Sequence, residues 1–192
     1  EAQFEMAPDE RIRALSEMDI EAKNPRWAGV MAVFYPNAEG ETTLVLILRK
    51  TYKGVHSNQV GFPGGKAETL DQSIKHTALR ETEEEVGLAQ SEIEVVKKLT
   101  KLYIPPSNFW VQPFIGYVKE TPRFIKEEAE VEAILEVSLK QFLDDKSVIT
   151  QRIDTSYGTM LDVPAFYLAE HVVWGATAMM LSEVKWALQQ LD

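Results

Sequence analysis

The chain has 192 residues, of which 45% are hydrophobic, and this is long enough for one substantial core. No polar linker divides it, so we expect a single globular α/β domain. A formal net charge of −10 disfavours nonspecific nucleic-acid binding, because that binding depends on Lys and Arg neutralising phosphates. The absence of cysteine excludes disulfides and thiolate metal sites and favours a reducing compartment, so we expect the cytoplasm. No apolar run approaches the roughly 18 to 20 residues that a membrane span needs, so no membrane partner is expected.

The first expected elements are a helix and a β-hairpin. Residues 5–22 place apolar side chains at mostly helical spacing, which predicts a helix inside an N-terminal extension over residues 1–27. The main domain is then expected over residues 28–192 as one unit. Its first two apolar runs, 28–35 and 43–48, are separated by the turn-forming PNAEG and predict a hairpin with a long loop.

The remaining elements alternate between strands and helices. The segment 70–86 has helical spacing, and Gly87 is a natural stop for it. Five further segments are expected as strands and two as helices. The strands are 93–103, 110–118, 130–138, 147–154 and 160–168, and the helices are 139–144 and 174–190. This order favours a mixed sheet flanked by helices, an α/β/α sandwich.

The helix at 70–86 ends in an unusually acidic stretch, RETEEE. Successive helical residues turn by about 100°, so Glu81, Glu84 and Glu85 fall on one arc while Glu83 points to the opposite side. Three carboxylates on one arc repel each other unless a cation or strong donors neutralise them. Two interpretations follow: a solvated acidic helix face, or a site for a hard divalent cation such as Mg²⁺ or Mn²⁺.

The residues around this acidic stretch favour the metal site. Pro63 stiffens the turn ahead of the helix, and the glycines after it let the backbone approach a ligand, so the Gly64 carbonyl is a candidate metal ligand. Arg80 offers a rigid guanidinium fork that can hold the neighbouring Glu81 in position. Metal-bound carboxylates beside a close backbone indicate phosphate chemistry.

These residues resemble the signature of the Nudix hydrolases, G-x5-E-x7-R-E-U-x-E-E-x-G-U with U aliphatic. Gly65 stands at its start, and RETEEEVGL at residues 80–88 matches its second half in register. The chain departs from the signature at two positions. Asp71 stands where Glu is usual, with eight residues before the Arg instead of seven, and Thr82 stands where an aliphatic residue is usual.

The resemblance extends to the coenzyme A diphosphatase-like subgroup. The lead-in HSNQVGFPGG at residues 56–65 is similar to the H-x-x-Q-[VI]-x-F-P-G-G of that subgroup, and so is Asp71 with its extra residue. Weaker similarities follow in the expected order over roughly residues 28 to 186. They are PPS at 105–107, VQPF at 111–114, EV at 130–131, VSL at 137–139 and VWGATA at 173–178.

The resemblance implies a role for each acidic residue. Glu84 and Glu85 are implied as the principal metal ligands, and Glu81 as a further ligand or as the group that orients or deprotonates the attacking water. Asp71 is either a helix N-cap or part of the metal site. Glu130 is implied as a candidate that completes the metal shell. Glu127, Glu128 and Glu132 compete with it, and a solvated acidic loop is the alternative.

Substrate-binding candidates follow from the same comparison. His56 and Gln59 are candidates for contact with a phosphate or pantetheine segment, or they are structural. The subgroup has an Arg and a Gly where this chain has Gly54 and Asn58, so Arg49 or Lys53 is expected to supply the missing positive charge. Three aromatic residues are either stacking platforms for a base or core residues. They are Phe109, Trp110 and Tyr117.

The implied activity is hydrolysis of a diphosphate bond, dependent on Mg²⁺ or Mn²⁺, in a nucleoside diphosphate linked to another moiety. Coenzyme A or its thioesters lead as substrates, giving 3′,5′-ADP and 4′-phosphopantetheine or its acyl form. ADP-ribose, dinucleotides and oxidised nucleotides are alternatives, and so is a domain that senses a nucleotide without cleaving it. The sequence leaves open whether the chain forms a homodimer.

Overall fold

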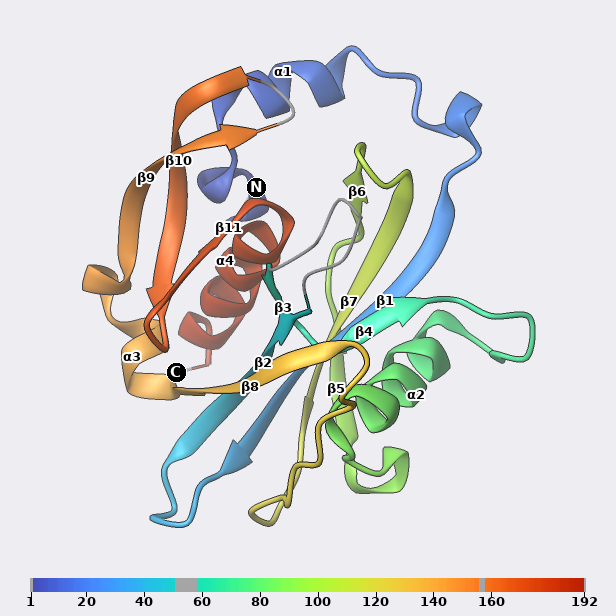
Figure 1. Cartoon of the computed structure of the whole chain (residues 1–192), viewed down its shortest axis with the longest axis vertical. Helices are drawn as coiled ribbons and strands as arrows, with labels where there is room; N and C mark the ends of the chain where they lie inside the picture. Colours follow the sequence, from blue (N-terminus) through green and yellow to red (C-terminus); the bar gives the residue numbers. More distant parts are fainter. Residues whose placement is uncertain (1, 51–58, 156–157, 192) are drawn as a thin grey trace.

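The centre of the molecule is a large mixed β-sheet, seen in a computed structural model that describes residues 2–50, 59–155 and 158–191 (Figure 1). Its strands are β1 (Arg26–Pro36), β2 (Thr42–Arg49), β3 (Val60–Gly61), β4 (Gly64–Lys66), β5 (Glu94–Lys98), β6 (Leu102–Ile104), β7 (Phe109–Tyr117) and β8 (Val131–Ser138). The main path runs β3-β2-β1-β7-β5, and β4, β6 and β8 pair with β1, β7 and β2, respectively. Strands β1 and β7 are parallel, whereas the other pairs in this sheet are antiparallel.

Helices cover both faces of this sheet, which confirms the expected sandwich. Helix α2 (Ile74–Val86) packs on one face, and α4 (Gly175–Gln189) packs on the other (Figure 1). A second, antiparallel sheet lies against α4; it consists of β9 (Val148–Thr155), β10 (Gly158–Leu168) and β11 (His171–Trp174). The shorter helices are α1 (Asp9–Ser16) and α3 (Leu139–Leu143), with 3₁₀ turns at Ala2–Met6, Glu21–Lys23, Gln90–Glu92 and Asp145–Ser147.

The alternation of side chains along the central strands builds two cores. Successive strand residues point to opposite faces, so one apolar strand can serve both layers. In β1 the residues facing α4 are Val30, Ala32 and Phe34, and those facing α2 are Met31, Val33 and Tyr35. This explains why the first strand is apolar without a break: it is buried on both sides.

The N-terminal segment differs from its prediction. One helix was expected over residues 5–22, but α1 is much shorter and has 3₁₀ turns on either side of it. Side-chain contacts and not helical regularity hold this segment in place. Gln3 Nε2 donates to Glu183 and to the Thr100 carbonyl, and Arg11 donates to the Tyr103 carbonyl.

Other boundaries were also corrected by the structure. The strand expected over residues 93–103 is two strands, β5 and β6, which both pair with β7. Helix α2 begins at Ile74 and not at Leu70, which is exposed to solvent. The short strands β3, β4 and β11 were missed, because two to four residues are too few to show a periodic pattern.

Gly29 allows α2 to lie directly on β1, and this predicts a large response to a single methyl group. A Cβ at Gly29 would lie 2.4 Å from the Ile74 carbonyl oxygen and 2.9 Å from Ala78 N, both backbone atoms of α2. We expect Gly29→Ala to lower the free energy of unfolding by about 1–3 kcal/mol, because the helix must move away from the strand. Urea unfolding measures this. Gly61→Ala, where the nearest atom is 3.8 Å away, is the control and should stay near wild type; equal stability of the two variants would contradict the prediction.

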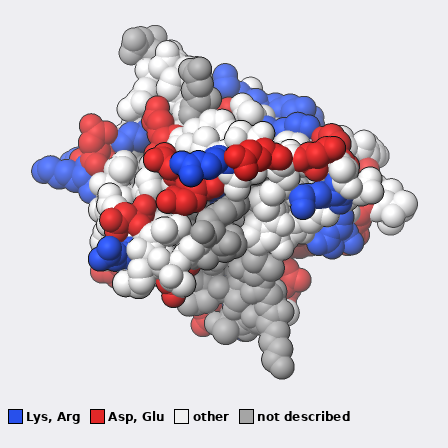
Figure 2. Space-filling model, turned by 90° about the horizontal axis from the view of Figure 1, so that it is seen from above, with Lys and Arg blue, Asp and Glu red and all other residues white. Residues whose placement is uncertain are grey.

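The surface carries charges of both signs. Figure 2 shows Asp and Glu side chains interspersed with Lys and Arg on the face that it presents. Among the described helices, none is long and apolar enough to cross a membrane.

Candidate active site

Helix α2 presents the acidic residues, and its two ends are fixed by local hydrogen bonds. Ser73 is the N-cap, and its hydroxyl accepts from His76 N. Gly87 ends the helix in the left-handed region, at φ 72°, which favours glycine. Thr82, the departure from the aliphatic consensus, is fully buried and donates its hydroxyl to the Ala78 carbonyl at 2.7 Å. A polar residue is tolerated there because its hydroxyl has a partner.

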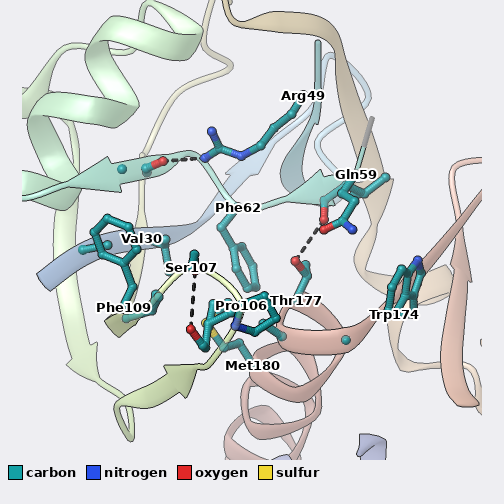
Figure 3. A pocket seen from close by; sticks show the side chains of 18 of the residues that line it. Val30, Arg49, Gln59, Phe62, Pro106, Ser107, Phe109, Trp174, Thr177 and Met180 are labelled. Atoms are coloured by element: carbon teal, nitrogen blue, oxygen red, sulfur yellow. Dashed lines mark hydrogen bonds between the residues drawn. The ribbon is translucent and has the colours of Figure 1, made fainter. Parts of the chain in front are cut away.

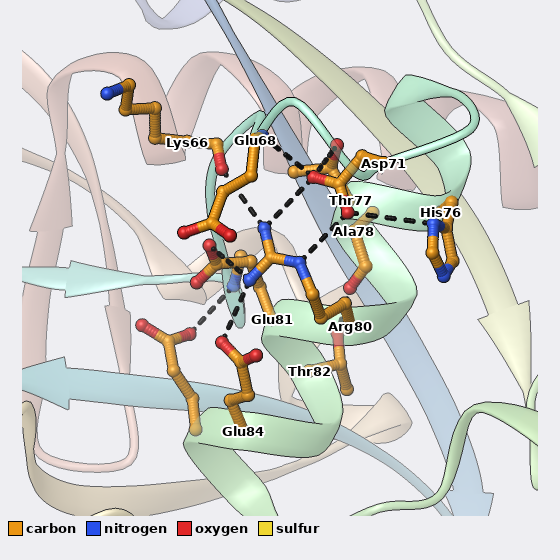
Figure 4. A network of polar contacts seen from close by, with 12 residues as sticks. Lys66, Glu68, Asp71, His76, Thr77, Ala78, Arg80, Glu81, Thr82 and Glu84 are labelled. Atoms are coloured by element: carbon orange, nitrogen blue, oxygen red, sulfur yellow. Dashed lines mark hydrogen bonds and ion pairs between the residues drawn. The ribbon is translucent and has the colours of Figure 1, made fainter.

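Arg80 is the centre of a network of polar contacts (Figure 4). Its Nε and Nη2 donate to the two carboxylate oxygens of Asp71, at 2.9 and 3.0 Å. Its Nη1 lies 3.0 Å from Glu81 Oε1 and 2.9 Å from Glu84 Oε2, and Nη2 also donates to the Lys66 carbonyl. The expected contact between Arg80 and Glu81 is therefore present, within a larger network.

Asp71 anchors this network and does not act as the helix N-cap. Its carboxylate accepts from Arg80, from Thr77 Oγ1 and from Glu68 N, and its side chain is only 2% exposed. The N-cap interpretation was wrong, because Arg80 and Thr77 take up the carboxylate while Ser73 caps the helix. Chiefly through its hydrogen bond with the Arg80 guanidinium, the pKa of Asp71 is held well below its usual range.

Glu85 is the buried carboxylate of the site. Its side chain is 2% exposed; Oε2 accepts from Gly64 N at 2.7 Å, and Oε1 lies 3.3 Å from Arg49 Nη1. Arg49 also donates through Nη2 to the Gly64 carbonyl at 2.6 Å. Burial raises the pKa of Glu85 to about 7, against the lowering effect of Arg49 and of the Gly64 N–H.

Glu81 lies between these two groups. A Cβ on Gly65 would fall 2.3 Å from Glu81 Oε2, so the glycine leaves room for this carboxylate beside the turn. Burial raises the pKa of Glu81 in spite of Arg80, and the charges of Glu84 and Glu130 add to the effect. Glu81 and Glu130 likewise add to the raised pKa of Glu85. Glu130 therefore lies close enough for its charge to act on both carboxylates, although its own side chain is exposed.

The donor set fits a hard cation. The candidate ligands are carboxylate oxygens and one backbone carbonyl, which are the atoms that Mg²⁺ and Mn²⁺ prefer. Within the described parts of the chain, however, no three acidic or histidine side chains are gathered as a ready metal cluster. The candidate ligands are instead paired with arginines: Arg80 contacts Glu81 and Glu84, and Arg49 contacts Glu85 and the Gly64 carbonyl. Glu84 is also 57% exposed.

A cavity of about 640 Å³ opens next to Gly64 and Arg49 (Figure 3). Its walls are mainly apolar, and the polar groups are few. Apolar lining residues include Val30, Phe62, Phe109, Val111, Trp174 and Met180. Thr177, at the start of α4, donates to the Val60 carbonyl at 2.9 Å and fixes one edge of the cavity. An apolar cleft with a few polar groups beside a cluster of carboxylates is the usual form of a small-molecule site.

The structure places some of the expected substrate residues at this cavity. Arg49 and Gln59 line it, whereas His56 and Lys53 lie outside the described residues, as do Gly54 and Asn58. The sequence did not identify the contact between Arg49 and Glu85, or the role of α4 in the cavity wall. A signal for the first was present: an Arg that ends an apolar strand.

The three candidate aromatic residues have different environments. Phe109 lines the cavity, under the guanidinium of Arg26. Trp110 is adjacent in the strand and packs instead against Trp27 and Tyr103. Tyr117 donates its hydroxyl to Glu94 at the other end of β7. Of the three, Phe109 is the one placed to contact a ligand in this cavity.

Sequence comparison relates the chain to known proteins. Residues 25–153, more than half of the chain, match the family profile described as NUDIX domain. The chain is 31% identical over 177 residues to "Nudix hydrolase 15, mitochondrial" from Arabidopsis thaliana, covering 90% of this chain and 61% of that protein. It is 33% identical over 148 residues to an uncharacterized Nudix hydrolase, NudL, from Photorhabdus laumondii, covering 77% of this chain and 78% of that protein.

Solved structures support the same fold. A Nudix hydrolase from M. smegmatis, RenU, superposes with a TM-score of 0.59 at 13% identity, covering 88% of each chain. A MutT/nudix family protein from Enterococcus faecalis gives the same TM-score at 16% identity, covering 98% of this chain and 72% of the other. At these identities the likeness concerns the fold alone.

Proposed function

This chain belongs to the NUDIX domain family, and on that premise we propose that it is a metal-dependent pyrophosphohydrolase acting on a nucleoside diphosphate linked to another moiety. One observation carries the proposal. The buried Glu85 and the partly buried Glu81 lie against the Gly64–Gly65 turn, at the edge of a cavity large enough for a small-molecule arm. A solvated acidic helix face would not bury a carboxylate with a raised pKa.

In this proposal Glu81, Glu84, Glu85 and the Gly64 carbonyl hold Mg²⁺ or Mn²⁺, with Glu130 as a further ligand. The bound cation supplies a water of lowered pKa and neutralises charge on the diphosphate. The contribution of the protein is to hold the carboxylates in position. Arg80 keeps Glu81 beside Gly65, and the Gly64 N–H fixes the buried carboxylate of Glu85. Glu81 then orients the attacking water or accepts its proton, for an in-line displacement at phosphorus.

Coenzyme A and its thioesters are the proposed leading substrates, with Arg49 and Gln59 as binding residues at the cavity and Lys53 and His56 as further candidates. Two features support this choice: the HSNQVGFPGG lead-in and the apolar walls of the cavity. An apolar wall suits the pantetheine arm or its acyl group better than a second charged nucleotide. The cytoplasm remains our proposal for where the protein acts.

A substrate panel tests this proposal. Purified protein with Mg²⁺ or Mn²⁺ is given coenzyme A, an acyl-coenzyme A, ADP-ribose, a dinucleotide and an oxidised nucleotide, in ¹⁸O water. We expect mass spectrometry to find 3′,5′-ADP and 4′-phosphopantetheine or its acyl form, with one ¹⁸O in one of the two products. Release of no product from any member of the panel would refute the enzyme. Turnover of ADP-ribose alone would refute the choice of substrate.

A domain that binds a nucleotide without cleaving it is the second candidate. It is supported by the two arginines that neutralise the carboxylates, since Arg49 and Arg80 occupy four of the candidate ligand groups. Binding of ADP without any turnover in the panel would favour it over the hydrolase.

A further inference from the structure

We propose that Lys66 binds one phosphate group of the substrate, the one that lies at the mouth of the cavity. This inference rests on the proposed function, because it assumes a ligand that carries a diphosphate. Lys66 follows the glycine turn directly and is exposed, and it is one of the residues that line the cavity.

The register of β4 places Lys66 on the cavity side of the sheet. Gly65 pairs with Gly29, and Lys66 pairs with Ala28. Residues paired across two strands share a face, and neighbours along a strand alternate. Gly29 faces α2 and Ala28 lines the cavity, so Gly65 faces the carboxylates of α2 while Lys66 faces the cavity.

The backbone of Lys66 is fixed although its side chain extends outward. Its carbonyl accepts from Arg80 Nη2 at 3.1 Å, and Ala67 N donates to the Trp27 carbonyl at 2.9 Å. Figure 4 shows the ammonium group of Lys66 pointing away from the carboxylates around Arg80. Because the backbone of Lys66 is already fixed, binding a ligand orders only its flexible side chain, and little backbone entropy is lost.

The other positively charged side chains that line the cavity already have partners within the protein. Three Lys or Arg residues occur among the described residues that line it: Arg11, Arg49 and Lys66. Arg49 is held by Glu85 and the Gly64 carbonyl, and Arg11 is buried and donates to the Tyr103 carbonyl. Across the described residues, no carboxylate lies within ion-pair distance of Lys66.

The negative charge around the cavity entrance favours a phosphate-binding role for Lys66. Glu81 and Glu85 lie against the Gly64–Gly65 turn, which lines the cavity, so their negative charges oppose the entry of an anionic substrate. A cation held by the carboxylates would neutralise charge on the nearer part of a diphosphate, and the charge nearer the cavity would need a partner from the protein. Lys66 lies on the cavity side, and an ammonium group is a common partner for phosphate.

The test measures ADP binding and turnover in Lys66→Met. With Mg²⁺ present, we expect the Kd for ADP from calorimetry to rise by about 5- to 20-fold, as for the loss of one charge-assisted contact at an exposed site. Lys66→Arg should recover most of the affinity. Raising the salt concentration should weaken ADP binding less in Lys66→Met than in wild type, because one ionic contact is missing.

Lys75→Met is the matched control, since Lys75 is also exposed but lies on α2 outside the cavity lining. Unchanged ADP affinity in Lys66→Met, or an equal loss in Lys75→Met, would overturn the inference. In turnover of the best panel substrate, KM should rise while kcat stays within about twofold. The proposed function can fail separately: wild-type protein that binds ADP through Lys66 but cleaves nothing refutes the hydrolase and leaves this contact standing.

Discussion

Glu85→Gln is expected to abolish most of the hydrolysis while leaving the fold intact. The side chain is buried, and its Oε2 accepts from Gly64 N at 2.7 Å. Glutamine keeps the shape and an acceptor for that N–H, but it removes the negative charge that would hold the cation. We expect kcat to fall by about 10²- to 10⁴-fold, as for the loss of a preorganised electrostatic group. Turnover of the best panel substrate measures this, and Mn²⁺ titration should show weaker metal binding.

The control for this prediction is Glu83→Gln, on the same helix and with the same loss of charge. Glu83 is exposed on the other side of α2, where it accepts from Gln90 Nε2. Its substitution should leave kcat within about twofold of wild type. Thermal unfolding checks that both variants fold. A folded Glu85→Gln protein with wild-type turnover would rule out Glu85 as a ligand and would count strongly against the proposed mechanism.

The second large effect is expected on stability, from Arg80→Ala. This change removes both hydrogen bonds to Asp71, whose side chain is only 2% exposed, and leaves a buried carboxylate without its cation. It also releases Glu81 and Glu84. Asp71 keeps its contacts with Thr77 and with Glu68 N, so we expect a loss of about 2–3 kcal/mol. The midpoint of urea unfolding measures the loss, and Arg80→Lys should be intermediate because lysine cannot form the bidentate contact.

A surface arginine provides the comparison for Arg80. Arg152 lies 3.5 Å from Asp162, but both side chains are about two-thirds exposed. Arg152→Ala should therefore cost less than about 1 kcal/mol. If the two variants lost equal stability, the contacts of Arg80 would contribute no more than a solvated ion pair.

The sandwich could be predicted from the sequence because its main strands and its acidic helix each show a clear pattern within a short stretch of residues. The unbroken apolar runs that became β1 and β2 indicate strands buried on both faces, and the periodic stripe of α2 ends at a glycine. The helix expected over residues 5–22 was wrong for the opposite reason. Most of that segment is polar or exposed, and its order depends on contacts such as the one between Gln3 and Glu183.

From the sequence alone, we could name the residues that we propose for the chemistry and the helix face on which three of them lie. The spacing of Glu81, Glu84 and Glu85 follows from helix geometry alone. Tertiary structure decided their environments, because burial and partners depend on chain segments that are distant in sequence. Glu85 is buried because Arg49 and Gly64 close over it, while Glu84 stays exposed on the same helix. Asp71 likewise became the anchor of Arg80 and not a helix cap, since a carboxylate takes the strongest donor within reach.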